Sequence, residues 1–178
     1  FAFNFCAQKI QERNLEAVDL SSWRVVINCS EPMFWRSMQQ FLERFAPYGL
    51  SLSALSTSYA MAENVFAVTQ NRPGHPLTLD RISQSAYLSQ RIARPAAEQE
   101  AALTMVSAGT LVARTQIRVL DEERRELPER HIGEIALQSN CMLTGYYHRP
   151  DESQKAFHDG WYLTGDLGYI ADGEVYIT

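Results

Sequence analysis

The sequence has few cysteines, few histidines and no long apolar run, and each shortage excludes a class of protein. The three cysteines, Cys6, Cys29 and Cys141, are odd in number and far apart, which excludes a disulfide framework and favours a reducing compartment, the cytoplasm. The four histidines show no ligand spacing, so they predict no metal site. No apolar run approaches the roughly 18 residues of a membrane helix, and we expect no membrane span.

Positive charge is also scarce. Lys and Arg number 16 against 21 Asp and Glu, which gives a formal net charge of -5 at pH 7. Binding to nucleic acid needs clustered basic side chains, and the densest basic spot, Arg124–Arg125, is surrounded by glutamates. We therefore expect no nucleic-acid partner. The 46% hydrophobic content still suffices for a buried core.

Both ends of the chain look cut. The sequence opens on Phe1 without Met, and it stops at Val175–Thr178, inside an alternating strand-like run. We therefore expect a piece of a longer protein.

Residues 1–70 show helical and strand patterns in alternation. A short apolar, β-branched run at 25–27 predicts a buried strand, and residues 52–59 and 65–69 are expected to form two further strands. Apolar residues at i, i+4, i+7, i+8 and i+11 predict an amphipathic helix, with Pro32 in its first turn and Pro47 with Gly49 at its end. They are Phe34, Met38, Phe41, Leu42 and Phe45. An earlier helix is expected to carry Phe1, Phe5 and Ile10 on one face.

The rest of the chain divides into a connection and a β-rich part. Residues 71–103 are polar and punctuated by proline, and they predict a long connection with a helix near 84–94. Residues 104–178 alternate in the manner of short strands separated by turns. The predicted fold class is α/β: an α/β layer (1–70), the connecting insertion (71–103) and a small antiparallel, barrel-like β subdomain (104–178).

Two short segments carry polar groups suited to nucleotide chemistry. Tyr59–Glu63 ends a predicted strand; its ring can stack on a base, and its carboxylate suits Mg²⁺, which prefers oxygen ligands. Thr164–Asp166 is a glycine-containing turn whose ionised Asp can accept hydrogen bonds from two sugar hydroxyls. The structural alternatives are a packed Tyr, a surface Glu and an Asp bonded to its own turn. Neither segment by itself distinguishes a nucleotide-binding role from a structural one.

Taken in order, four segments resemble elements of the adenylate-forming superfamily, which includes acyl-CoA synthetases, luciferases, peptide-synthetase adenylation domains and fatty acyl-AMP ligases. Two of them resemble the Tyr-Gly-x-Thr-Glu and Trp-x-x-Thr-Gly-Asp elements of that superfamily. The segments are Asn28–Pro32, Tyr59–Glu63, Gly133–Ile135 with Gly145–Pro150, and Gly160–Gly168.

The resemblance implies ATP and Mg²⁺ as cofactors and a role for each matching residue. Glu63 would be the catalytic acid that binds the metal, and Asp166 would hold the ribose hydroxyls. Tyr59 would stack on adenine, and the remaining pocket residues would be Ser30, Glu31, Pro32 and Ala60. The phosphate loop and the catalytic Lys of the superfamily have no match here, so the fragment alone is expected to be inactive.

The sequence also departs from the superfamily pattern at three positions. Ala60 replaces a Gly, at a place where φ can be positive. Ala62 replaces a Thr and so lacks a hydroxyl, and Cys29 stands where Gly is commoner. These changes can narrow or disable the pocket.

Within the superfamily, Phe3–Cys6 and Asp19–Arg24 look like the fatty acyl-AMP ligase branch. The connection over 71–100 would hold the insertion that marks this branch, or it would be a tolerated surface loop. The first hypothesis is an enzyme that makes acyl-AMP from a fatty acid and passes the acyl group to an acyl carrier protein. Transfer to CoA and a degenerate nucleotide-binding scaffold remain as alternatives.

Overall fold

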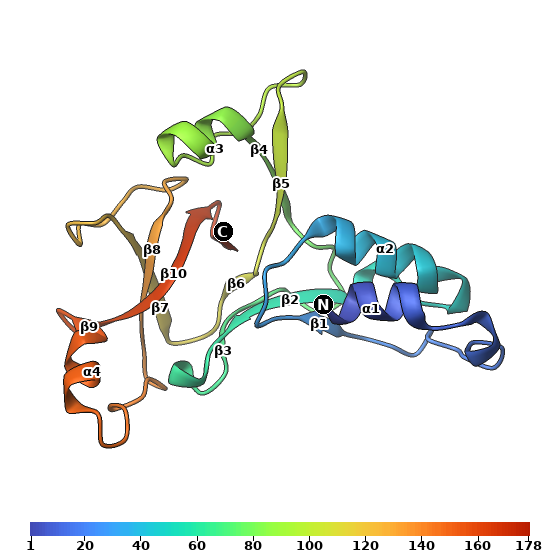
Figure 1. Ribbon diagram of the computed structural model, residues 1–178, viewed down its shortest axis with the longest axis horizontal. Helices are drawn as coiled ribbons and strands as arrows, with labels where there is room; N and C mark the ends of the chain where they lie inside the picture. The colour runs from blue at the N-terminus through green and yellow to red at the C-terminus, as the bar shows by residue number, and fades with distance from the viewer.

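The computed structural model describes residues 1–178, and its secondary structure forms three sheets with four helices around them (Figure 1). A mixed sheet has the order β1-β2-β3-β6, an antiparallel sheet has the order β11-β10-β8-β7 with β9 on β10, and β4 pairs with β5. The helices are α1 (Ala2–Lys9), α2 (Trp35–Phe45), α3 (Gln84–Gln90) and α4 (Pro150–Lys155). The strands are β1 (Val26–Asn28), β2 (Leu55–Ala60), β3 (Ala67–Gln70), β4 (Leu79–Ser83), β5 (Ala102–Val106), β6 (Thr110–Leu111), β7 (Thr115–Leu120), β8 (Gly133–Ser139), β9 (Phe157–His158), β10 (Trp161–Ala171) and β11 (Glu174–Ile177).

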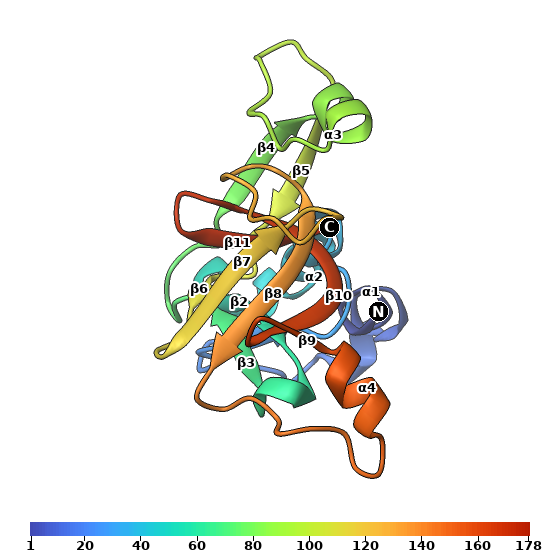
Figure 2. The ribbon, with the colours of Figure 1, turned by 90° about the vertical axis from the view of Figure 1, so that its left-hand side faces the viewer.

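This architecture confirms the predicted fold class. The mixed sheet has one parallel pair, β1 with β2, and its other pairs are antiparallel. The second sheet is antiparallel throughout and curls as a half-barrel in front of the first (Figure 2). The two sheets share a core built from β2, β3, β8, β10 and β11.

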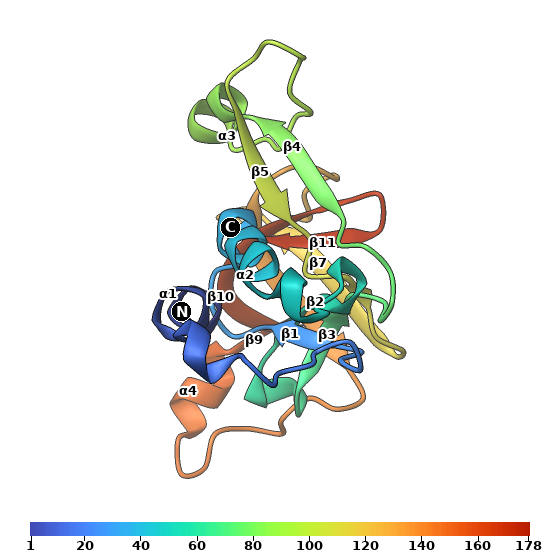
Figure 3. The ribbon, with the colours of Figure 1, turned by 90° about the vertical axis from the view of Figure 1, so that its right-hand side faces the viewer.

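Helices α1 and α2 lie together on the mixed sheet (Figure 3). Helix α2 confirms the amphipathic prediction, since Met38, Phe41 and Phe45 are buried. Two expectations were wrong at the edges of this layer. Pro32 precedes the helix, which begins at Trp35, and Phe34 is 64% exposed because it stands at the N-cap.

Helix α1 confirms the expected helix, and the residue that it buries lies outside the face expected to carry Phe1, Phe5 and Ile10. Phe1 and Phe5 do share a face, with ring centroids 5.7 Å apart, but both are exposed. Phe3 is the buried residue, and its ring stacks on Phe41 of α2 at 4.5 Å. The partner helix therefore decides which face of α1 is buried.

Strand β2 is buried on both faces although its sequence is rich in hydroxyls. Buried hydroxyls need hydrogen-bond partners, and each finds one. Thr57 donates to the carbonyl of Ser107 at 2.6 Å, Ser58 donates to the carbonyl of Thr69 at 2.8 Å, and Ser56 accepts from Gln70 at 2.9 Å. The strand begins at Leu55, since Leu52–Ala54 forms a 3₁₀ turn, so the expected start at residue 52 was wrong.

Residues 71–103 contain more regular structure than the sequence predicts. Strands β4 and β5 pair in antiparallel register, and α3 follows β4 directly. The Ser83 hydroxyl caps α3 by accepting from the Ala86 amide at 3.3 Å. The expected helix is confirmed, and it ends at residue 90 where Arg91 adopts a φ of 53°.

No helix of the chain is both long and apolar enough to cross a membrane.

Candidate functional site

The two segments singled out in the sequence, residues 59–63 and 164–166, meet where the mixed sheet and the antiparallel sheet face each other. The Tyr59 hydroxyl, at the end of β2, donates to Asp166 Oδ2 on β10 at 2.6 Å. Burial, followed by this hydrogen bond, raises the pKa of Tyr59 above its ordinary value. The hydroxyl therefore keeps its proton and holds one oxygen of the carboxylate, which leaves Oδ1 as the oxygen able to accept from a ligand.

Asp166 is presented by an irregularity inside β10 rather than by a turn between strands. The register of β10 against β8 shifts between Leu163 and Leu167, and Gly165 has a φ of 75°. The Thr164 hydroxyl donates to the carbonyl of Ile135 at 2.7 Å and accepts from the Asp166 amide at 3.1 Å. The bulge is thus fixed to β8, and it turns the Asp166 side chain toward Tyr59.

Glu63 lies in a 3₁₀ turn between β2 and β3, and it is half-buried. Its Oε1 accepts from the Tyr146 hydroxyl at 3.1 Å, and that hydroxyl lies 2.9 Å from the hydroxyl of Tyr162. Burial, and then the hydrogen bond with Tyr146 and the charge of Glu63, raise the pKa of Tyr162. Sequence reasoning gave neither tyrosine a role, because nothing local pairs Glu63 with a residue 83 positions away.

The segment Ser30–Pro32 is an exposed loop that follows β1. Because β1 is parallel to β2, with Asn28 opposite Thr57, the loop leaves the sheet at the same edge as Tyr59 and Ala60. Open α/β sheets bind ligands at this carboxyl edge. No hydrogen bond joins the loop to Tyr59, Glu63 or Asp166, and Glu31 instead contacts the amine of Phe1 at 2.7 Å.

The structure also bears on two of the expected roles. Tyr59 is only 7% exposed, so most of its ring belongs to the core between the sheets, and a stacking role stays a prediction. Ala60 is absent from the residues with positive φ, so its Cβ causes no backbone strain there. The positive φ that the resemblance allowed for at this position is therefore not adopted, and an effect of Ala60 on the pocket stays a prediction.

The donor set can be tested against the groups that the resemblance implies. No three or more His, Cys, Asp or Glu side chains gather as a metal cage. Mg²⁺ commonly uses one or two carboxylates together with phosphate oxygens and water, so Glu63 alone fits a magnesium ion that is shared with a triphosphate. Neither Glu63 nor Asp166 forms an ion pair with Lys or Arg, so both carboxylates keep their acceptor capacity.

A family model described as AMP-binding enzyme matches residues 2–147. The chain belongs to the AMP-binding enzyme family. It is 29% identical over its whole length to the medium-chain fatty acid–[acyl-carrier-protein] ligase JamA of Moorena producens, and covers 32% of that protein. It is 32% identical over 99% of its length to the long-chain fatty acid–AMP ligase FadD32 of Mycobacterium marinum, and covers 31% of it.

A solved structure of the same family shows the same arrangement of elements. This is the fatty acyl-adenylate ligase from L. pneumophila in complex with acyl adenylate and pyrophosphate, with a TM-score of 0.92 and 27% identity. The match covers 99% of this chain and 32% of that one. The chain thus spans about a third of the length of the relatives it matches.

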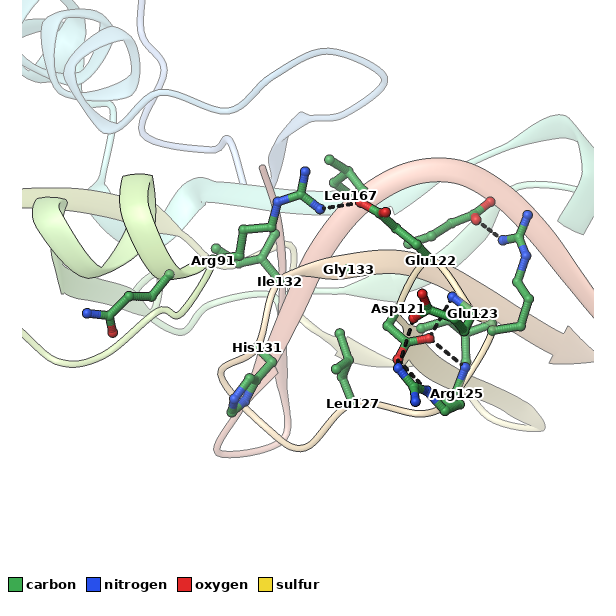
Figure 4. Close-up of a pocket in the computed structure, with 14 residues that line it drawn as sticks. Arg91, Asp121, Glu122, Glu123, Arg125, Leu127, His131, Ile132, Gly133 and Leu167 are labelled. Atoms are coloured by element: carbon green, nitrogen blue, oxygen red, sulfur yellow. Dashed lines mark hydrogen bonds and ion pairs between the residues drawn. The ribbon is translucent and has the colours of Figure 1, made fainter.

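A cleft lies elsewhere in the chain, between the end of α3 and the β7–β8 connection (Figure 4). It has a volume of about 670 Å³, and its charged residues are paired with one another. Arg125 bridges Asp121 and Glu123 at 2.7 and 2.8 Å, and Arg91 pairs with Glu122 at 3.2 Å. None of Tyr59, Glu63 and Asp166 lines this cleft, so the candidate site lies apart from it.

Proposed function

We propose that this chain is part of an enzyme that activates fatty acids with ATP and passes the acyl group to an acyl carrier protein. In the first step a fatty carboxylate oxygen bonds to the α-phosphorus of ATP, and the bond from that phosphorus to the bridging oxygen breaks, which releases pyrophosphate. In the second step the carrier thiol attacks the acyl carbon, loses its proton and displaces AMP.

The contact between Tyr59 and Asp166 is the observation that carries this proposal. It joins two segments 107 positions apart, each of which resembles a nucleotide-binding element of the superfamily. In our proposal Asp166 accepts hydrogen bonds from the ribose hydroxyls, and Tyr59 fixes the orientation of that carboxylate. Ser30, Glu31, Pro32 and Ala60 would line the adenine side at the edge of the sheet.

Glu63 would hold the metal of the reaction. A bound magnesium ion would supply charge neutralisation for the phosphate oxygens. This chain would hold that ion through the Glu63 carboxylate, which accepts a hydrogen bond from Tyr146 at 3.1 Å. Such chemistry rests on positioning more than on covalent catalysis.

We further propose that the chain by itself does not catalyse adenylation, because no Lys or Arg is paired with, or hydrogen-bonded to, either acid of the site. Residues 71–103 would form an insertion that influences the acceptor step, between residues 1–70 and 104–178 of the same domain. The three free thiols suit a cytoplasmic location.

The test uses the full-length protein that contains this chain, with ATP, Mg²⁺ and a panel of fatty acids. We expect acyl-AMP to form and the acyl group to move to an acyl carrier protein while CoA stays unacylated. Rapid formation of acyl-CoA would instead make CoA the acceptor. ATP binding without turnover of any acid would contradict the enzymatic proposal and indicate a nucleotide-binding scaffold.

A paired substitution tests the site itself. Asp166→Asn should weaken ATP binding by about tenfold or more, since a charge-assisted acceptor is lost. The control Asp151→Asn removes an exposed acid on α4 and should leave binding unchanged. Equal ATP affinity of the two variants would remove Asp166 from the nucleotide site.

A further inference from the structure

We propose that Tyr146 is a positioning residue for Glu63, and that Tyr162 holds Tyr146 in place through a hydrogen bond. Together the two hydroxyls determine which oxygen of the Glu63 carboxylate is left to face the metal. The inference rests on the proposed function, in which Glu63 ligates a divalent cation together with ATP. It adds two residues behind that site: Tyr146 comes from the segment between β8 and β10, and Tyr162 comes from β10 itself.

The hydroxyls of Tyr146 and Tyr162 form a chain that ends on the carboxylate. Tyr146 donates to Glu63 Oε1 at 3.1 Å, so its oxygen is free to accept the proton of Tyr162 at 2.9 Å. Tyr162 is only 5% exposed, so its buried hydroxyl needs this partner for its proton. A donor that itself accepts a hydrogen bond is polarised and binds an anion more strongly.

The backbone of the Glu63 turn is held by the same segment. The Leu143 amide donates to the carbonyl of Glu63 at 2.8 Å, and the Ser139 hydroxyl donates to the side-chain oxygen of Asn64. Asn64 in turn donates to the carbonyl of Ala67 at 2.9 Å. Residues 139–146 therefore fix both the main chain and the side chain of this turn.

A strained residue completes the turn. Val65 has φ 65° and ψ −52°, and the Phe66 amide donates to the Asn64 carbonyl at 2.7 Å across it. This is a γ-turn with positive φ, which is rare, and it is rarer still for a β-branched residue. Such strain persists only where surrounding contacts over-determine it, and it gathers at functional positions.

The chemical consequence concerns the two oxygens of Glu63. Tyr146 occupies Oε1, which leaves Oε2 as the oxygen able to ligate a cation. A carboxylate with both oxygens free rotates about its last bond and loses conformational freedom when it binds. The hydroxyl of Tyr146 removes that freedom beforehand, so the loss of this one hydroxyl should weaken metal binding while the nucleotide pocket at Asp166 stays intact.

The test measures binding of Mn²⁺, an oxygen-seeking stand-in for Mg²⁺, to the full-length protein with a non-hydrolysable ATP analogue. Free Mn²⁺ is followed by electron paramagnetic resonance, so the readout does not depend on turnover. We expect Tyr146→Phe to raise the Kd for Mn²⁺ about tenfold, as a hydrogen bond to a charged group is lost. Tyr162→Phe should raise it about threefold, because it acts only through Tyr146.

Tyr147→Phe is the matched control. Tyr147 is the next residue along the chain, is 88% exposed and makes no hydrogen bond to Glu63, so its variant should bind Mn²⁺ like the parent. Affinity for the analogue without metal should be the same in all three variants. A general loss of structure would lower that affinity too, which separates positioning from misfolding.

Glu63→Gln distinguishes failure of this inference from failure of its premise. If Glu63→Gln weakens Mn²⁺ binding but Tyr146→Phe matches Tyr147→Phe, the positioning role is overturned and the metal role of Glu63 stands. If Glu63→Gln leaves Mn²⁺ binding unchanged, both the metal role of Glu63 and the role of Tyr146 are overturned.

Discussion

Two networks of carboxylates and tyrosines join distant parts of this chain, and they differ in one respect. In the first, Asp80 on β4 accepts from Arg130 at 2.9 Å and from Tyr169 at 3.0 Å. In the second, Asp166 accepts from Tyr59, and no cation is paired with it. In the first network the acid has a cation beside it, which Asp172 shares at 3.1 Å, whereas in the second the acid has no cation.

The comparison indicates how to separate a structural acid from a ligand-binding one. Asp80 is 9% exposed, and a charge at that depth needs a partner of opposite sign. Asp166 is half-buried, so water or a ligand can meet its remaining acceptor capacity. An acid that is held in place by hydroxyls but left without a cation is therefore the better candidate for binding.

Arg130→Met should lower the free energy of unfolding by about 3 kcal/mol, because it leaves Asp80 charged and unpaired in the interior. Urea denaturation of the full-length protein measures the change. Arg125→Met is the control, since Arg125 pairs with Asp121 and Glu123 on the surface with 73% of its side chain exposed. Its substitution should lower the stability far less, because solvent screens an exposed ion pair, and equal losses would contradict the distinction.

Tyr169→Phe should cost about 2 kcal/mol, as a buried hydrogen bond to a charged acceptor disappears while Arg130 still pairs with Asp80. Tyr169 is fully buried, and burial followed by the charge of Asp80 raises its pKa, so its proton is always available in the native state. The same denaturation experiment applies. ATP affinity should not change, because this network lies outside the proposed site.

Tyr59→Phe should cost about 1 kcal/mol in the same assay, since water can replace the hydroxyl at the half-buried Asp166. Unlike Tyr169→Phe, it should also weaken ATP binding, because the ribose acid loses its fixed orientation. Isothermal titration with ATP distinguishes the two tyrosines. If both variants bind ATP like the parent protein, the contrast between the networks fails.

Val65→Gly should raise stability by about 0.5 kcal/mol. Glycine removes the strain of a positive φ, of about 1–2 kcal/mol, against an entropic cost of about 0.5–1 kcal/mol. The Ala variant at this position keeps the positive φ and serves as the comparison. A loss of stability in Val65→Gly would show that Val65 contributes packing, although it is 75% exposed.

Glu100 gives the smallest effect, confined to acid pH. The Ser83 hydroxyl, Arg94 and the Ala97 amide hold its pKa at about 2, against an ordinary value of 4.5. The stabilisation is complete above pH 4.5 and is lost as the pH falls from 4.5 towards 2. Glu100→Gln should therefore flatten the dependence of the urea midpoint on pH in that window, and an unchanged slope would contradict the prediction.

The sequence predicted what depends on local periodicity. The stripe Met38, Phe41 and Phe45 and the β-branched run at 25–27 gave α2 and β1, because the burial of one helix face or one strand is encoded at short range. Phe3 was missed because its burial depends on Phe41, 38 positions away, and the pairing of β4 with β5 was missed because their partners lie across a polar stretch.

In the candidate site, too, contacts between distant residues were not predicted from the sequence. Resemblance to a family gave Tyr59, Glu63 and Asp166, and the structure brings Tyr59 and Asp166 together. The sequence around Tyr146 and Tyr162 does not indicate that their hydroxyls bind Glu63 or each other, since tyrosines are common in turns and strands. Only the fold of the segment between β8 and β10 brings the hydroxyl of Tyr146 to Glu63.

Strand β10 takes part in both networks, with Asp166 in one and Tyr169 in the other, three positions apart. Its two edges are paired with β8 and β11, so its register is fixed on both sides. A single inserted or deleted residue between Asp166 and Tyr169 would turn one of the two side chains to the opposite face. Homologous chains should therefore keep this spacing of three positions constant.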